Sequence, residues 1–422
     1  MSRCIMDSSD KTNISRFLTD AKWSAAELNE HRLKFMLAET VKQRRKAKDS
    51  VLPIDDTMCE HVGGLFEYVD RHYNHTDHTY PLAHNLVTAH YVSGAVRFPI
   101  DCRLYRRYEE FTQWEMFVKK HFPEVEIPKK KKERNKFRKR VEPQLLLDPD
   151  FVALHQAFET KIALACQLVE YALEHELPFE TVLFDSWYLA PDLLAVLKAH
   201  NKNWISILKT NRNLVTATVN LKDADGQPVQ FEKSTIQVRE LVPLIPKSAF
   251  KPLELEGKTY YCFTKNLSLT SLGKVRLVIC FESPDCEGNY VVLVTNCLSW
   301  NAKKIIASYL LRWPIETFYQ DCKQLLGLDE YRMRSADAIG KHWALLFVAY
   351  SFLSLDCLPN SSGKSRILAP NSSIGQAIRR QQKATIESLI LFAHQLLQAG
   401  KQTSEVFDLL FAKQYLSIAQ KC

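Results

Sequence analysis

Several features that mark other protein classes are missing from this sequence. Glycine is scarce, with 12 residues among 422, and the 17 prolines are ordinary in number, so collagen-like and low-complexity classes are excluded. The 11 cysteines form no Cys-x-x-Cys pair, which favours free thiols in a reducing cytosol over disulfides or a structural zinc. The N-terminus is too polar for a signal peptide, and the longest apolar run, Trp343 to Leu355, is too short to span a membrane. We therefore expect a globular cytoplasmic protein without a membrane segment.

Positive charge, by contrast, is concentrated in one place. Residues 129–140 read KKKKERNKFRKR and carry a net charge of +8, which equals the formal net charge of the whole chain. A single concentrated basic patch is typical of a surface that binds a polyanion, and Lys130 and Arg138 are its candidate DNA-binding residues. The alternative is a solvated basic linker with no ligand.

The order of apolar segments indicates a mixed α/β fold. β-rich runs at 51–57, 85–92 and 95–105 are followed by an amphipathic helical segment at 151–175, a strand at 181–185, a helix at 193–200 and a strand at 204–208. Three strands, helix, strand, helix, strand is the order of a ribonuclease-H-like core, in which the first and fourth strands are neighbours.

The remaining segments divide the chain around this core. Residues 213–298 contain only short β-like runs and predict an all-β insertion. We therefore expect a helical N-terminal region at 1–50, which is a candidate truncated DNA-binding part, and a helical C-terminal region at 359–422. The core lies between them in two parts, 51–212 and 299–358.

One short stretch after the insertion concentrates chemistry. Tyr309, Arg312, Glu316 and Lys323 fall within roughly 60° of arc on a helix. A carboxylate between two cations and a phenol is suited to holding a metal ion beside a phosphate. Pro314 lies inside the stretch and predicts a kink or the start of a new helix there.

Two further acids end core strands. Asp56 ends the first strand and Asp185 the fourth, so their carboxylates would repel each other unless a divalent cation lies between them. Oxygen ligands suit Mg²⁺, and a pair of such ions suits in-line attack on a phosphodiester. Strand-terminal aspartates are also common turn formers, so each acid alone is a weak signal.

The spacing Tyr309, Arg312, Glu316, Lys323 resembles the Y-(2)-R-(3)-E-(6)-K signature of bacterial insertion-sequence transposases with a DDE active site. Trp313 follows the arginine as in relatives, and the segments around Asp56-Thr57 and Asp185 resemble the first and second acid motifs. The resemblance covers about residues 50–350 and implies a cut-and-paste transposase with a ribonuclease-H-like catalytic domain.

That resemblance implies roles for individual residues. Asp56, Asp185 and Glu316 correspond to a catalytic triad that binds two Mg²⁺ ions, for which Mn²⁺ can substitute, and Tyr309, Arg312 and Lys323 to residues that hold DNA phosphates. Trp313 is a candidate to stack on an extruded base. The expected partner is double-stranded DNA, both element ends and target, bound by a homodimer in a bacterial cytoplasm. Asp55 remains an alternative to Asp56, which the following threonine favours.

Three alternatives stay open. Only 55 residues precede Asp56, fewer than family members usually have, so a truncated DNA-binding protein that inhibits an intact relative is the main alternative function. A general ribonuclease-H-like nuclease is a second, although it leaves the Tyr-Arg-Lys phosphate contacts unexplained. The third concerns His72, His75, His78 and His84, whose spacing suggests zinc but lacks a completing cysteine or carboxylate.

Overall fold

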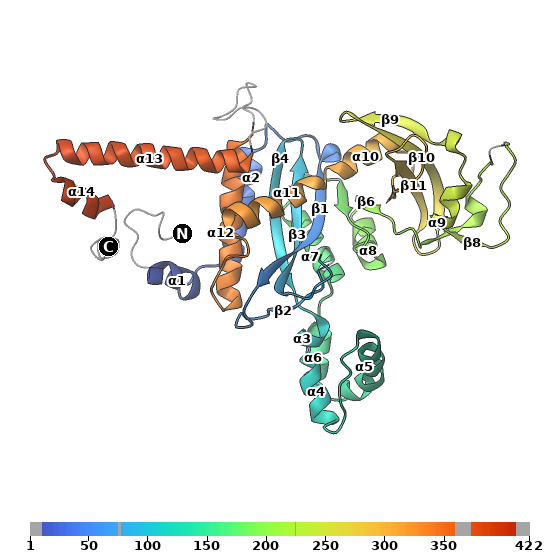
Figure 1. Ribbon diagram of the computed structural model, residues 1–422, viewed down its shortest axis with the longest axis horizontal. Helices are drawn as coiled ribbons and strands as arrows, with labels where there is room; N and C mark the ends of the chain where they lie inside the picture. Colours follow the sequence, from blue (N-terminus) through green and yellow to red (C-terminus); the bar gives the residue numbers. More distant parts are fainter. Residues whose placement is uncertain (1–10, 75–76, 224, 359–372, 411–422) are drawn as a thin grey trace. The chain divides into compact units, whose positions relative to one another are not determined.

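The computed structural model describes residues 11–74, 77–223, 225–358 and 373–410. The described chain divides into two compact units. One comprises residues 45–64 and 68–317 and holds the sheet; the other comprises the chain up to residue 44, residues 65–67 and the chain from residue 318, and is helical. Figure 1 labels the elements of both units. The prediction of a mixed α/β fold is confirmed.

The sheet unit is built on 12 strands that form one continuous sheet among the described residues. The path runs β2-β3-β1-β5-β6-β12-β11-β10-β7-β8, with β4 paired to β3 and β9 to β10. The strand bounds are β1 Val51–His61, β2 Asp70–Arg71, β3 Leu82–Ser93, β4 Val96–Tyr105, β5 Thr181–Phe184, β6 Asn203–Ile207, β7 Asn213–Val215, β8 Thr235–Gln237, β9 Lys251–Leu255, β10 Lys258–Leu269, β11 Gly273–Phe281 and β12 Tyr290–Thr295.

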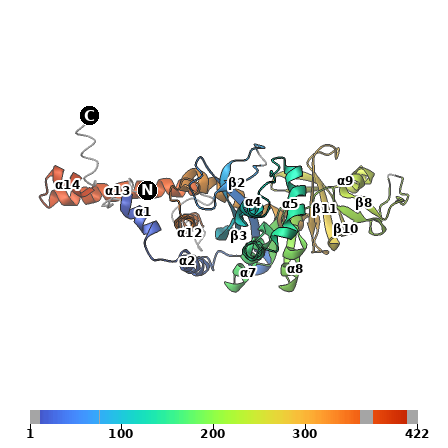
Figure 2. The ribbon, with the colours of Figure 1, turned by 90° about the horizontal axis from the view of Figure 1, so that it is seen from below.

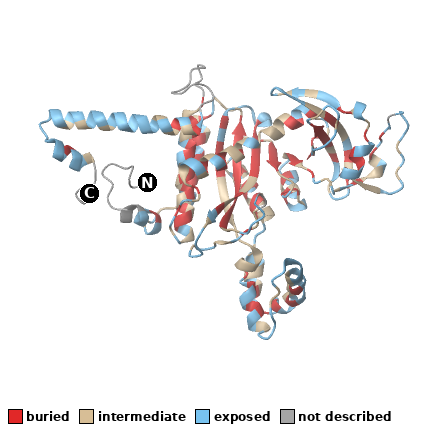
Figure 3. Ribbon diagram, in the orientation of Figure 1, coloured by how far each residue is buried: buried red, intermediate tan, exposed pale blue. Residues whose placement is uncertain are grey.

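The first half of this sheet has the predicted strand order. β1, β3 and β4 form an antiparallel meander, and β5 returns parallel to β1 with Pro53 opposite Leu183. β6 then adds parallel to β5. Parallel strands need a crossover, and α7 and α8 supply one each, from β4 to β5 and from β5 to β6. These strands are apolar and buried, as Figure 3 shows in red.

The predicted insertion does not form a separate sheet. β12 pairs antiparallel with β6, so the strands of residues 213–298 extend the core sheet. This segment also contains the helix α9 (Val238–Leu241), so it is β-rich rather than all-β. Helix α10 (Ala302–Leu310) follows it and packs Ile305 and Ile306 on Val51, Leu183 and Ile205, which face the same side of the sheet.

The basic stretch is helical rather than a linker. The chain between β4 and α7 forms α3 to α6, and these helices pack around a cluster that includes Trp114, Phe137 and Phe151. Figure 1 shows them gathered below β2, and Figure 2 shows α4 and α5 in the turned view. The predicted helix at 151–175 is two helices, α6 and α7. The bounds are α3 Tyr108–Phe111, α4 Trp114–His121, α5 Lys131–Leu145, α6 Pro149–Ala157, α7 Lys161–Glu174 and α8 Pro191–Ala199.

The helical unit contains the apolar helix α12. The longest apolar run of the sequence, Trp343 to Leu355, lies within this helix, and many of its residues are buried. By length and composition α12 could cross a membrane, but the core helix of a globular protein can be equally long and apolar. Of the most apolar 18-residue stretch of α12, 56% is buried inside the protein. Arg32 of α2 donates to Ser351 of α12 at 2.8 Å. The bounds are α1 Lys11–Thr19, α2 Ala25–Glu39, α12 Ala336–Asp356, α13 Ile374–Gln398 and α14 Thr403–Leu410.

Candidate active site

The acids at the strand ends lie where β1 and β5 stop running side by side. The parallel ladder joins residues 51–53 to residues 181–183, and β5 ends at Phe184. Asp55 and Asp56 therefore follow the paired part of β1, and Asp185 follows β5 directly. Carboxyl ends of adjacent parallel strands meet at one edge of a sheet, so the strand order brings these three carboxyl groups to the same edge.

Arg312 connects this edge to the helix that follows. It lies between α10 and α11 (Trp313–Asp321), where the chain starts a new helix with Pro314 in its first turn, as the sequence predicts. Its guanidinium forms an ion pair with Asp55 and lies 3.1 Å from Glu316 Oε1. The Tyr309 ring centre is 6.0 Å from the guanidinium carbon, and burial raises the pKa of Tyr309 to about 12. Arg312 thus joins an acid from β1 to an acid from α11.

Asp56 has a different set of partners. Lys161, the first residue of α7, places Nζ 2.7 Å from Oδ2, and Asn85 Nδ2 lies 3.3 Å from the same oxygen. The hydroxyl of Tyr188 donates to Oδ1 at 2.9 Å. Both oxygens of Asp56 are therefore hydrogen-bonded.

The acids share one electrostatic environment. The pKa of Asp55 is raised to about 7, chiefly by burial; the charge of Arg312 opposes this rise, and the charges of Glu316, Asp56 and Asp185 add to it. Burial also raises the pKa of Asp185, against a hydrogen bond from the Trp187 amide to Oδ1 at 2.8 Å, and the neighbouring Asp56 adds to the rise. Carboxylates that are buried together disfavour each other's charge. The acid cluster, defined as Asp55, Asp56, Asp185 and Glu316, is therefore short of positive charge.

The chemistry of this cluster fits a divalent cation. Its four acids face two cations, Arg312 and Lys161, which leaves a formal excess of two negative charges. All donors are carboxylate oxygens, which hard cations such as Mg²⁺ prefer. Within the part of the chain that the structure describes, no three His, Cys, Asp or Glu side chains form a metal-binding group as they stand. The carboxylate oxygens are instead held by Arg312, Lys161 and Tyr188.

The predicted DNA-binding residues fall into three groups. Tyr309 and Arg312 lie at the acid cluster, and Trp313 is 69% exposed at the start of α11. Lys323 belongs to the π-helical turn Cys322–Leu326 in the helical unit. The other two lie in the segment that follows β4. Lys130 is exposed and directly precedes α5. Arg138 of α5 is 4.0 Å from Glu109, and its guanidinium carbon is 5.0 Å from the Tyr108 ring centre.

Two partners of Asp56 carry no role in the sequence-based prediction. Tyr188 lies in the motif around Asp185, three residues after it, and could have been found there. Lys161 lies 105 residues from Asp56 and has no motif of its own. Only the fold brings the start of α7 next to β1.

The histidines do not gather into a zinc site among the described residues. His72 is buried, His78 Nδ1 lies 2.8 Å from the Tyr73 hydroxyl, and the His84 ring packs on His61. His75 lies outside the described residues.

Because His72 is buried, we expect the folding stability of the protein to depend on pH. Burial, reinforced by the charge of Lys161, lowers its pKa to about 4. In the unfolded chain this histidine has an ordinary pKa of about 6.5. The free energy of unfolding is therefore at its full value above pH 6.5 and falls as the pH drops towards 4. At pH 4 the loss amounts to about 3 kcal/mol. Urea unfolding of the wild type and His72→Gln between pH 7 and pH 4 should show a shallower fall in the variant. The exposed His200→Gln serves as control, and parallel curves for all three proteins would contradict the prediction.

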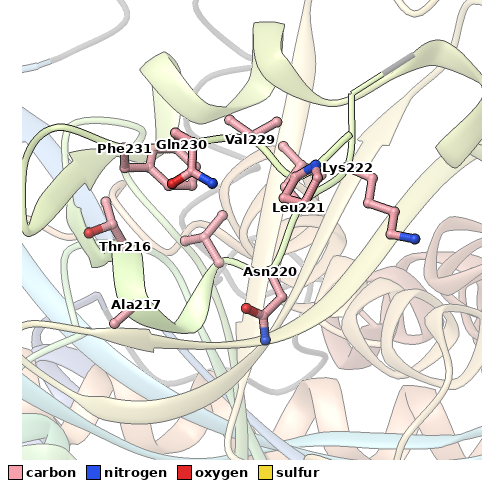
Figure 4. Close-up of a pocket in the computed structure, with 10 residues that line it drawn as sticks. Thr216, Ala217, Asn220, Leu221, Lys222, Val229, Gln230 and Phe231 are labelled. Atoms are coloured by element: carbon pink, nitrogen blue, oxygen red, sulfur yellow. The ribbon is translucent and has the colours of Figure 1, made fainter. Parts of the chain in front are cut away.

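A separate cavity of about 530 Å³ lies in the β-rich insertion, between the segments 216–222 and 228–231. Figure 4 shows its lining, in which Lys222 is the charged side chain and no carboxylate takes part. This cavity offers no acid–base or metal chemistry, so the acid cluster remains the candidate active site.

One of three comparisons with known proteins shows the family of this chain. The search among curated proteins found no match. Among solved structures, the NurA nuclease from Sulfolobus solfataricus is similar at 11% sequence identity and a TM-score of 0.21, over 81% of this chain and 92% of that one. Neither the fold nor the function of this chain is inferred from that similarity. The family model described as DDE superfamily endonuclease matches residues 1–235, more than half of the chain and including Asp55, Asp56 and Asp185. The chain therefore belongs to the DDE superfamily endonuclease family.

Proposed function

We propose that this protein is a DDE transposase, which cuts DNA at the ends of a mobile element and joins those ends to a target. The observation that carries the proposal is the acid cluster, in which Arg312 pairs with Asp55 of β1 and Glu316 of α11, and its charge also acts on Asp185. The endonuclease family supports cleavage of DNA, and the spacing of Tyr309, Arg312, Glu316 and Lys323 supports the transposase class. The strand order of β1 to β6 supports a ribonuclease-H-like core.

Within this proposal Asp56, Asp185 and Glu316 are the catalytic acids that hold two Mg²⁺ ions. When bound, such ions activate the attacking oxygen and stabilise the leaving oxygen of a phosphodiester. Asp56 is kept as the first acid because a threonine follows it as in the family pattern, and its charge adds to the raised pKa of Asp185. Asp55 has another role, which is to orient the Arg312 guanidinium by their ion pair. Water, and then a 3′-hydroxyl, would be the nucleophiles, so no covalent enzyme–DNA intermediate is needed.

The cations of the site have a part of their own. Arg312 and Tyr309 are positioned to bind a DNA phosphate next to the acids, since guanidinium and phosphate pair through two parallel hydrogen bonds. Lys161 neutralises Asp56, with Nζ 2.7 Å from Oδ2. We place the reaction in a bacterial cytoplasm and propose a homodimer on the DNA, with one protomer for each element end.

A DNA-binding protein without catalysis is the second candidate. It is favoured by the fact that Asp55 and Asp56 pair with Arg312 and Lys161 in the structure, an arrangement that needs no metal ion. In such a protein the cluster would be a structural ion-pair network, and the chain would act by binding DNA or by mixing with an intact relative.

A plasmid assay separates these functions. A supercoiled plasmid that carries the reading frame with its flanking DNA is incubated with the protein and Mg²⁺, and a plasmid without the flanks serves as control. We expect nicks and breaks at the flanks only, seen by primer extension. A gel shift without strand breaks would support the binding protein, and equal cleavage of both plasmids would support a general nuclease.

A further inference from the structure

The helices between β4 and α7 form a small helical module, defined as residues 108–157. It has a hydrophobic cluster of its own, to which α4 contributes Trp114 and Phe117, α5 contributes Phe137 and Val141, and α6 contributes Phe151. None of the acids of the proposed active site belongs to it. A module with its own apolar core can hold a rigid surface outside the catalytic centre.

Several acids of this module pair with its own basic residues. Arg134 lies 2.6 Å from Glu115 and donates from Nε to Glu109 at 2.7 Å. Lys120 and His121 lie 2.6 and 2.7 Å from the buried Asp148. These contacts pair Arg134, Lys120 and His121 with acids of the module, while Glu133 of α5 is exposed and lies beside the basic residues of that helix.

The outer side of α5 is basic. Lys132, Lys136, Lys139 and Arg140 are exposed and fall within roughly 100° of arc, opposite the buried Phe137, Val141 and Leu145. Three more exposed lysines, at 129–131, lie at the start of the helix. Among the described residues, no ion pair involves any of these seven cations. The seven residues 129–132, 136, 139 and 140 are named the basic face of α5.

We propose that the basic face of α5 is a second DNA contact, which binds the phosphate backbone of duplex DNA independently of its sequence. The proposal rests on the proposed function, since an enzyme that cuts DNA is the source of the ligand. Lys132 and Lys139 are about 10 Å apart along the helix, so one face can reach more than one phosphate. A membrane surface fits less well, because a helix that binds lipid needs an exposed apolar face and the buried residues of α5 face the module core.

Removal of four of these charges tests the proposal. The full-length variant K132Q/K136Q/K139Q/R140Q is compared with the wild type by fluorescence anisotropy on a labelled 40-base-pair duplex at several salt concentrations. Each lost phosphate contact lowers the slope of log Kd against log salt by about 0.9. We expect a slope smaller by about 3 and an affinity that is weaker by roughly tenfold or more at 0.1 M salt.

Two further variants serve as controls. The variant R332Q/R379Q/K383Q/K401Q removes the same charge from exposed positions in the helical unit and should keep the wild-type slope. The charge-preserving K132R/K136R/K139R should bind like the wild type, which shows that charge and not packing is measured. Equal slopes for the wild type and K132Q/K136Q/K139Q/R140Q would overturn the proposal.

Competing ligands complete the test. A duplex RNA that competes better than duplex DNA for the basic face, or vesicles of phosphatidylcholine and phosphatidylserine that bind the wild type but not the variant, would also overturn it. Failure of this proposal is distinguishable from failure of the proposed function. If the wild type cuts the plasmid at the flanks while the basic face does not affect binding, only the second contact is wrong. If the basic face affects binding but no metal-dependent cleavage occurs, only the catalytic proposal is wrong.

Discussion

Replacing Asp185 by Asn is expected to reduce Mg²⁺-dependent strand cleavage by at least about 10³-fold. A metal ion that stabilises developing charge contributes several kcal/mol to the transition state, and each ~1.4 kcal/mol corresponds to a factor of ten in rate. Asn keeps the shape of the side chain but lacks the charge that the proposed metal site needs. Single-turnover cleavage of the flank-containing plasmid measures the loss, and Glu316→Gln should show the same loss.

The controls for this experiment address folding and binding. Asp225 is exposed in the insertion, so Asp225→Asn should cleave like the wild type. DNA affinity measured in Ca²⁺ should change little in Asp185→Asn, since Arg312, Lys161 and the basic face are intact. Cleavage that persists in both Asp185→Asn and Glu316→Gln would remove the acid cluster from the mechanism.

Asp185→Asn should increase the stability of the folded protein although it reduces activity. The pKa of Asp185 is raised by burial, so the folded protein binds this proton more tightly than the unfolded chain does. Stability then falls as pH rises from the unfolded value of about 3.8 through the folded one. Asn removes this penalty, so Asp185→Asn should melt at a higher temperature than the wild type at pH 8 and lose that advantage near pH 4. A gain in stability with a loss of activity is typical of a functional site.

The site was predictable from the sequence where its geometry is local or set by strand order. Arg312 and Glu316 are four residues apart, and their side chains lie together as predicted, 3.1 Å from each other, despite the helix break between Leu310 and Trp313. Asp185 lies beside the first-strand acids because parallel neighbouring strands end at one edge. The contact of Lys161 with Asp56 was not predictable, because the position of Lys161 at the start of α7 depends on the path of the chain through α3 to α6.

The fold was predictable where apolar residues set a clear period. The strands of the meander and the β-rich character of the insertion were predicted, whereas the helix α5 was not. Its helical period consists of Phe137, Val141 and Leu145 in a stretch that is otherwise polar and basic. The pairing of β12 with β6 was not predictable either, since register between strands that are 80 or more residues apart depends on the whole sheet.

Replacing Arg312 by Ala is expected to destabilise the sheet unit by about 3–5 kcal/mol in the absence of metal and DNA. Its side chain is 16% exposed and pairs with Asp55, of which 15% is exposed, and with Glu316. Removing one partner from a buried pair leaves an uncompensated charge, which costs roughly this amount. For a unit of this size the melting temperature should fall by roughly 10 °C. Differential scanning calorimetry at pH 8 measures the change, and the exposed Arg239→Ala is the matched control.

Mg²⁺ should partly replace the missing charge, because the acid cluster in Arg312→Ala keeps Lys161 as its cation and carries a larger excess of negative charge. A ligand that binds the folded state alone stabilises it in proportion to the logarithm of its concentration. Addition of 10 mM Mg²⁺ should therefore raise the melting temperature of Arg312→Ala by more than that of the wild type. A second variant, Arg312→Ala with Asp185→Asn, should lose most of this response, because a proposed ligand is gone. If Mg²⁺ stabilises all these proteins equally, the acid cluster does not bind the ion. The raised pKa values of Asp55 and Asp185 then belong to a structural ion-pair network.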